Sequence, residues 1–179
     1  MSEEEIEKTF LISSLPQGIE ALSPIELLDV YIPEESTHPK LRLRKRGENY
    51  EITKKILKNE SDLSIQIEQT IPLTQEEFEA ISSVSGKKIR KLRYTTLKNG
   101  VRMDLDLFLD ALYGLALVDF EFQDNKQKNN FISPNFVHRD VTQEKFIAGG
   151  LLAGKSYADI QSKLEDLGYK KLDYKYLIV

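Results

Sequence analysis

Residues 41–55 read LRLRKRGENYEITKK, and this stretch decides which fold the chain can adopt. Arg42, Arg44 and Arg46 lie two residues apart, and residues i and i+2 of a strand project from the same face. After a Gly-Glu-Asn turn the alternation resumes and reaches Lys55. The stretch therefore predicts a β-hairpin with one strongly cationic face. Such a face suits planar, multivalent anions, although a solvated edge hairpin accounts for the same pattern.

The composition limits the class of protein. The chain has 179 residues, of which 40% are hydrophobic and 30% charged, with a formal net charge of −4. This length allows one sizeable domain or at most two small ones, and we expect a single domain over residues 1–179. The acidic balance argues against nucleic-acid binding driven by bulk charge. The absence of cysteine fits a reducing compartment. Because no apolar run is long enough for a membrane span and the acidic start does not resemble a signal peptide, we expect a cytoplasmic protein.

Strand-like alternation recurs along most of the chain. Besides the hairpin, the pattern predicts strands at residues 3–13, 25–32, 62–71, 87–97, 101–108 and 115–122. Nearly all are joined by short loops, and Asn99-Gly100 is the strongest hairpin signal. Short connections make neighbouring strands antiparallel. Seven or eight such strands in one domain favour a closed barrel or a strongly curved sheet.

Helix signals are fewer. Thr74 opens a capping box for a helix ending near residue 83. Near the end of the chain, residues 143–179 are predicted to form a C-terminal helical extension. In that part of the chain, a helix from Thr142 to Ala148 is expected to stop at a Gly-Gly pair, and another covers residues 156–167.

The charged strand faces sort by sign. The acidic faces carry Glu5 and Glu7, Glu68, Asp104 and Asp106, and Asp119 and Glu121, whereas the basic faces carry Arg42, Arg44 and Arg46, Lys55, and Lys91 and Arg93. Two architectures fit. In an open sheet or sandwich, the apolar faces form the core and the charges meet water. In a barrel with helices outside, the charges line the interior, which is tolerable only if acids meet a metal and bases meet a polyanion. Divalent Mg²⁺ and Mn²⁺ prefer carboxylate oxygens.

The order of these residues resembles the CYTH domain, the family of triphosphate tunnel metalloenzymes. Seven short motifs of the family resemble segments spread over residues 5–142. In chain order they are EIEKTF, Arg42-Leu43-Arg44 with Thr53-Lys54-Lys55, Gln66-Ile67-Glu68, Lys91-Leu92-Arg93-Tyr94, Asp106-Leu107-Phe108, Gly114-Leu115 with Asp119-Phe120-Glu121, and Asp140-Val141-Thr142. The chain departs from the family at three positions. Thr9 replaces a Lys, Gln66 replaces a Glu, and Asp119 is one methylene shorter than the family's Glu.

The resemblance implies a mainly β, α+β fold, namely an eight-stranded antiparallel closed barrel with flanking helices. It implies metal-dependent hydrolysis of an inorganic, organic or nucleoside triphosphate inside the barrel, with Mg²⁺ or Mn²⁺ as cofactor. The residues carried over as catalytic are Glu5, Glu7, Arg42, Arg44 and Lys55. Those carried over as phosphate-binding are Arg42, Arg44, Lys55, Lys91 and Arg93. The metal-ligand set is Glu5, Glu7, Glu68, Asp106, Asp119 and Glu121. The expected partner is a small molecule that contains a triphosphate, and no binding to nucleic acid or membrane is expected. Because dimers are common among relatives, the resemblance makes a homodimer one possible assembly.

The departures leave other functions open. Thr9 and Gln66 allow a tunnel that binds polyphosphate or nucleotide with little or no turnover, and the same fold includes class IV-type adenylyl cyclases. Alternation places Lys8 on the face opposite Thr9, and a bulge could turn Lys8 inward. The 156–167 helix would either plug one mouth of the barrel or cover its outer wall. His38 and His138 are expected at the surface, since neither lies in a motif that would orient its imidazole.

Overall fold

The structure, a computed structural model, describes residues 2–59, 61–83, 86–98 and 100–178. Over these ranges the strands are β1 (Ser2–Ile12), β2 (Ile25–Ile32), β3 (Leu41–Arg46), β4 (Asn49–Asn59), β5 (Asp62–Leu73), β6 (Lys87–Lys98), β7 (Val101–Phe108), β8 (Ala116–Phe122) and β9 (Val137–Asp140). The α-helices are α1 (Gln75–Ser82), α2 (Asn125–Asn129), α3 (Gly149–Leu152) and α4 (Tyr157–Asp166). Single 3₁₀ turns are η1 (Ile19–Ala21), η2 (Asp110–Leu112), η3 (Lys145–Ile147) and η4 (Lys175–Leu177).

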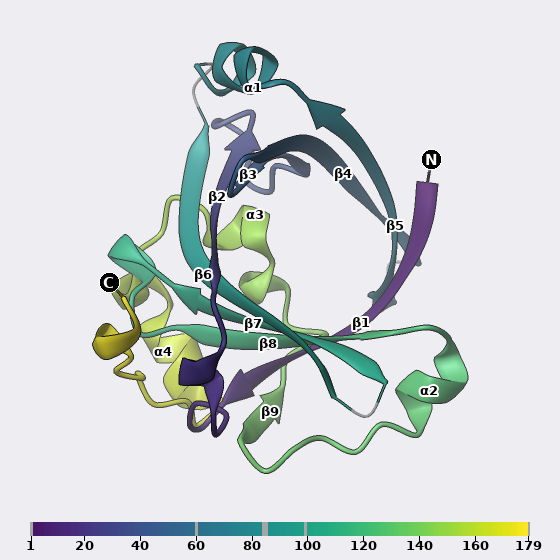
Figure 1. Ribbon diagram of the computed structural model, residues 1–179, viewed down its shortest axis with the longest axis vertical. Helices are drawn as coiled ribbons and strands as arrows, with labels where there is room; N and C mark the ends of the chain where they lie inside the picture. Colours follow the sequence, from purple (N-terminus) through teal and green to yellow (C-terminus); the bar gives the residue numbers. More distant parts are fainter. Residues whose placement is uncertain (1, 60, 84–85, 99, 179) are drawn as a thin grey trace.

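The sheet closes on itself. Its strand order is β5-β4-β3-β2-β6-β7-β8-β1-β9, every pairing is antiparallel, and β5 also pairs with β1. The first half of β1 pairs with β5 and its second half with β9, so β9 lies outside the closed ring (Figure 1). The predicted eight-stranded barrel is therefore confirmed, with a ninth strand added. Closure leaves few unpaired strand edges and fixes which side chains face inward.

The apolar strand faces point outward, and those of β7 and β8 are covered. Along β7 and β8, Leu105, Val118 and Phe120 are almost fully buried and belong to one cluster with Tyr174 from the end of the chain. The Tyr174 hydroxyl donates to the carbonyl oxygen of Phe108 (2.6 Å), so the tail docks on the barrel. At the top of Figure 1, α1 covers the wall formed by β3 to β5. Of the two predicted architectures, the barrel with an interior of charged side chains is correct.

Two helix predictions near the end of the chain were wrong. Thr142 does not cap a helix, because its hydroxyl donates to Asp140 Oδ1 (2.6 Å) and only the short turn η3 follows. The Gly149-Gly150 pair, predicted to stop a helix, instead opens α3. A Cβ added to Gly149 would lie 2.0 Å from the Tyr31 hydroxyl oxygen, and one added to Gly150 would lie 2.3 Å from a backbone carbonyl oxygen. Close approach to the barrel therefore requires glycine there.

Other differences concern short elements. The strand β9 and the helix α2, which Asp124 caps by accepting from Gln127 N (2.7 Å), were not predicted. The capping box at Thr74 and the α4 helix are confirmed. Asn99, half of the strongest hairpin signal, lies outside the described residues. In the described part of the chain, no helix has both the length and the apolar character needed to cross a membrane.

Candidate tunnel site

The barrel encloses a cavity of about 860 Å³. Every residue predicted for the site lines it, although those residues come from β1 and β3 to β8. They are Glu5, Glu7, Glu68, Asp106, Asp119 and Glu121 among the acids, and Arg42, Arg44, Lys55, Lys91 and Arg93 among the bases. Strict alternation along each strand accounts for this convergence, because the inward positions are the ones that carry charge.

One wall of the cavity is cationic. Arg42 and Arg44 project from β3 and Lys55 from β4. The Lys55 ammonium bonds Glu5 and lies 3.2 Å from Glu68 Oε2. Although burial opposes its charge, the neighbouring carboxylates hold the pKa of Lys55 well above its usual range. Arg42 differs, because its Nε is buried and has no hydrogen-bond partner in the described ranges. A buried donor without an acceptor is costly, so it marks a place for an anion.

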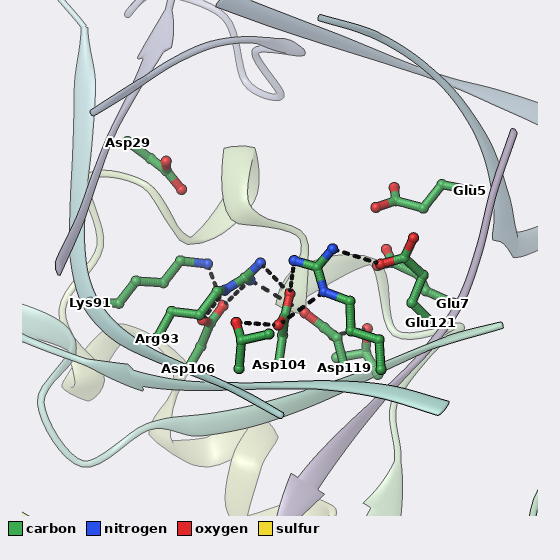
Figure 2. Close-up of polar contacts among 12 residues, drawn as sticks. Glu5, Glu7, Asp29, Lys91, Arg93, Asp104, Asp106, Asp119 and Glu121 are labelled. Atoms are coloured by element: carbon green, nitrogen blue, oxygen red, sulfur yellow. Dashed lines mark hydrogen bonds and ion pairs between the residues drawn. The ribbon is translucent and has the colours of Figure 1, made fainter. Parts of the chain in front are cut away.

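A second group of charges lies on β6 and β7, where Figure 2 shows Lys91, Arg93, Asp104 and Asp106 packed together. Arg93 donates to Asp106 through Nε and Nη2 (both 2.6 Å) and to Asp104 through Nη1 (2.9 Å). Lys91 also bonds Asp106. Burial opposes the ionisation of Asp106, yet these two cations hold its pKa well below the usual range. The phosphate-binding candidates Lys91 and Arg93 are therefore held in place by carboxylates.

The third wall is acidic and less well neutralised. Burial raises the pKa of Glu7 to about 8, against the opposing influence of Lys55, and it also raises the pKa of Asp119. Glu7 takes part in no ion pair within the described residues, and its carboxylate only accepts a long bond from Gln66 Nε2 (3.4 Å). Asp119 accepts a hydrogen bond from the Thr9 hydroxyl (2.7 Å) and lies 3.7 Å from Arg93 Nη2. A cation placed between these two carboxylates would stabilise both.

The donor chemistry fits a hard divalent cation. No group of three or more acidic, histidine or cysteine side chains is arranged to hold a metal ion among the residues that the structure describes. Mg²⁺, however, is commonly bound by one or two carboxylates together with substrate phosphates and water. Glu7 and Asp119 supply carboxylate oxygens whose charge the protein leaves partly uncompensated. Asp106, by contrast, is already engaged by two cations.

The position of Thr9 is now clear. Thr9 pairs with Asp119 and Lys8 with Phe120 in regular register, so no bulge turns Lys8 inward. Lys8 instead lines a smaller cavity outside the barrel, and the bulge hypothesis is wrong.

His38 and His138 are both exposed, as expected.

Among the lining residues absent from the predicted site, three are charged and paired with other lining residues. Asp104 accepts hydrogen bonds from Arg93, Thr95 and Arg102. Arg102 also lies 3.4 Å from Glu121 through Nη1, so it adds a cation to the acidic wall. Asp29, on β2, is 1% exposed and binds Arg44. The signal for Asp29 was a single carboxylate between Leu27 and Tyr31 on an otherwise apolar strand face.

The C-terminal part of the chain also contributes to the lining of the cavity. Residues 147–150, from η3 and the start of α3, line it together with apolar inward side chains such as Ile89 and Phe108. Residues of α4 do not line it, and they pack behind Leu152 in the same apolar cluster. Of the two roles left open for this helix, a plug in one mouth and a cover for the outer wall, its apolar packing away from the cavity fits the second.

Comparisons with known proteins agree with this geometry. The chain is 34% identical over 143 residues to an inorganic triphosphatase from Nitrosomonas europaea, a match that covers 79% of this chain and 91% of that protein. The chain belongs to the triphosphate tunnel metalloenzymes, the family of the CYTH domain. No family model matches the chain.

Two solved structures share the barrel fold. A crystal structure of an inorganic triphosphatase superposes with a TM-score of 0.60 at 30% identity, covering 83% of this chain and 93% of that one. A proposed adenylate cyclase from Bacillus halodurans superposes with a TM-score of 0.56 at 11% identity, covering 96% and 94% of the two chains. The second match shows the common fold alone, because its identity is low.

Proposed function

We propose that this protein hydrolyses a linear triphosphate inside its barrel, and that inorganic triphosphate is a substrate. One observation carries the proposal: a single cavity inside the barrel that is lined by both cationic and acidic side chains. A relative covering most of the chain carries the name inorganic triphosphatase. A chain of phosphates carries several negative charges, which the cationic wall can bind while the acidic wall holds a metal.

Each cation has a role in this proposal. Arg42, with its unpaired Nε, and Arg44 take phosphate oxygens on one side of the triphosphate. Lys55 takes oxygens near the acidic residues, and Lys91 and Arg93 do so from β6. Guanidinium and ammonium groups fixed in a partly desolvated cavity offset the charge that shifts as a phosphoryl group is transferred.

The carboxylates complete the site. Glu7 and Asp119, joined by Glu5, Glu68 and Glu121, would hold Mg²⁺ or Mn²⁺, whereas Asp106, also carried over as a metal ligand, is engaged by Lys91 and Arg93. When bound, such an ion supplies Lewis-acid polarisation of phosphoryl oxygens and lowers the pKa of bound water. Glu5 and Glu68 also keep the Lys55 ammonium in place, and Asp106 does the same for Arg93.

A tunnel that binds without turnover is the second candidate. The observation that favours it is Thr9, whose hydroxyl is committed to Asp119 where family members carry a Lys. No residue for adenine recognition is identified, which places a cyclase activity last.

The test is phosphate release from inorganic triphosphate, ATP and thiamine triphosphate, each with Mg²⁺, with Mn²⁺ and with chelator. We expect metal-dependent release, fastest with inorganic triphosphate. Glu7→Gln should lower turnover at least about 100-fold, because a carboxylate at the acidic wall is lost. Glu26→Gln is the matched control, since Glu26 is exposed and pairs with Arg90 outside the barrel. Tight triphosphate binding without release would instead support the binding tunnel.

A further inference from the structure

Asp29 is a buried carboxylate that belongs to none of the family motifs found in the chain. It lies directly opposite Arg44 in the β2–β3 pairing. Its two oxygens accept from Arg44 Nε (2.6 Å) and Nη2 (2.7 Å), a bidentate ion pair. The side chain of Asp29 is 1% exposed and that of Arg44 is 10% exposed. Fork-to-fork geometry of this kind fixes the plane of the guanidinium as well as its place.

The pairing leaves one end of Arg44 free. Nη1 makes no hydrogen bond to any described residue, and Arg44 lines the cavity. Asp29 therefore uses the edge of the guanidinium that carries Nε and Nη2, and Nη1 remains as a donor for a ligand. In Figure 2 the carboxylate of Asp29 stands on the β2 wall, apart from the acidic residues Glu5 and Glu7 on the opposite side. Its place is among the bases, not among the candidate metal ligands.

Three cations surround this one carboxylate. Burial opposes the ionisation of Asp29, but Arg44 first, and then Arg42 and Lys91, hold its pKa well below the usual range. These cations therefore favour the charged form of the carboxylate. It has two effects with opposite consequences for an anionic ligand: it orients Arg44, and it subtracts one charge from the cationic wall.

We infer that Asp29 is a positioning residue, which presents Arg44 to a phosphate group of the substrate, and that orientation outweighs the charge it subtracts. The inference rests on the proposed function and deepens it. Long side chains lose rotamer freedom when they bind, so a guanidinium already held in its bound orientation loses less. A free Arg44 would also be able to swing within a cavity that contains many other carboxylates.

The first experiment is Asp29→Asn, which keeps the shape and removes the charge. We expect KM for inorganic triphosphate to rise about tenfold or more, with kcat lowered less than about threefold, because positioning for binding is lost. Calorimetry with inorganic triphosphate in the presence of chelator should show a matching loss of affinity. Asp29→Glu keeps the carboxylate and should restore a large part of the affinity. Asp62→Asn, at an ion-paired carboxylate outside the barrel, is the matched control.

A double-mutant cycle tests whether Asp29 acts through Arg44. Arg44→Lys keeps the positive charge but loses the fork. The double variant Asp29→Asn/Arg44→Lys should bind triphosphate no more weakly than Arg44→Lys alone, since the two residues act as a unit. Independent, additive losses would overturn the inference. So would tighter binding by Asp29→Asn, which would mean that charge subtraction dominates. Because the calorimetric arm contains no turnover, it stands even if the wild-type protein proves unable to hydrolyse triphosphate.

Discussion

At the scale of single residues, Thr9 sets the electrostatics of the acidic wall. Its hydroxyl donates to Asp119, but it carries no charge, so Glu7 and Asp119 face each other with little compensation. Ionisation of Glu7 is opposed by burial, and its pKa is raised to about 8. A raised carboxylate pKa means that the metal-binding form gains population only as the pH rises towards 8.

Metal-dependent turnover should therefore increase from pH 6 to pH 9. Thr9→Lys places an ammonium beside both carboxylates, which lowers their pKa, so the acidic limb of the pH–rate profile should move down by about one pH unit or more. The measurement is kcat/KM between pH 5.5 and 9.5 with Mg²⁺. Thr9→Val adds no charge and removes the hydrogen bond to Asp119. The acidic limb of its pH–rate profile should therefore stay at the same pH or move to higher pH. If the acidic limbs of the wild-type and Thr9→Lys profiles lay at the same pH, this account would be contradicted.

Residue-scale prediction from sequence succeeded where alternation decides direction. Period two places the charged side chains of β1 and of β3 to β8 on one face of each strand, and the family resemblance predicted that this face points into the barrel, where the acids and bases do meet. Partners could not be predicted in this way. That Asp29 binds Arg44 depends on the β2–β3 register, and that Arg102 reaches Glu121 depends on the β7–β8 register. Register is a property of a strand pair, and the sequence of either strand by itself does not determine it.

At the scale of elements, a polar cluster ties α2 and the segment after β9 to the start of β5. Asp62 Oδ1 accepts from the Ser64 hydroxyl (2.6 Å) and from Gln143 Nε2 (3.2 Å), while Lys128 lies 3.6 Å from Oδ2. The Ser64 hydroxyl and amide lower the pKa of Asp62 to about 2. Because the folded pKa lies below the unfolded value, this group stabilises the fold above about pH 4, and the contribution is lost as the pH falls towards 2.

Asp62→Asn should lower the free energy of unfolding by about 1 kcal/mol at pH 7, a figure reduced for the partial exposure of the carboxylate. The difference between the variant and the wild type should narrow to about half at pH 3, where the wild-type carboxyl begins to be protonated. Urea unfolding at the two pH values measures it. Ser64→Ala removes the leading cause of the pKa shift and should weaken the same pH dependence. A difference that is equal at both pH values would mean that the carboxylate does not act through its ionisation.

Elements differ in how far the sequence predicts them. The long strands and the capped helices α1 and α4 carry enough turns or alternations to identify themselves. The helix α3 and the strand β9 have four residues each, too few for a period to appear. Gly149 is explained only by the side chain of Tyr31, which is distant in sequence. Its close approach to the barrel could not be predicted locally.

At the scale of the whole molecule, the barrel surrounds charged side chains, some of which are not compensated by opposite charges on the same wall. The β3 wall holds Arg42 with an unpaired donor, and the β1 and β8 walls hold Glu7 and Asp119 with raised pKa values. Each of these costs stability in the free protein. A triphosphate with a divalent cation would satisfy both sides at once, and it would connect strands from opposite walls of the shell.

Ligand binding should therefore stabilise the whole fold, since a ligand that binds only the native state adds RT ln(1 + [L]/Kd) to the free energy of unfolding. At about 100 times Kd this is about 2.7 kcal/mol, which for a chain of this size raises Tm by about 5–10 °C. The measurement is thermal unfolding with Ca²⁺ or Mg²⁺ and inorganic triphosphate, followed before turnover depletes the ligand. Sodium sulfate at equal ionic strength controls for general screening and should raise Tm far less. The Arg42→Gln variant should show only a small part of this rise in Tm. It lacks the buried Nε donor that has no hydrogen-bond partner among the described residues and is available to an anion. If triphosphate and sulfate gave equal shifts, the cavity would be responding to ionic strength and not to a bound phosphate chain.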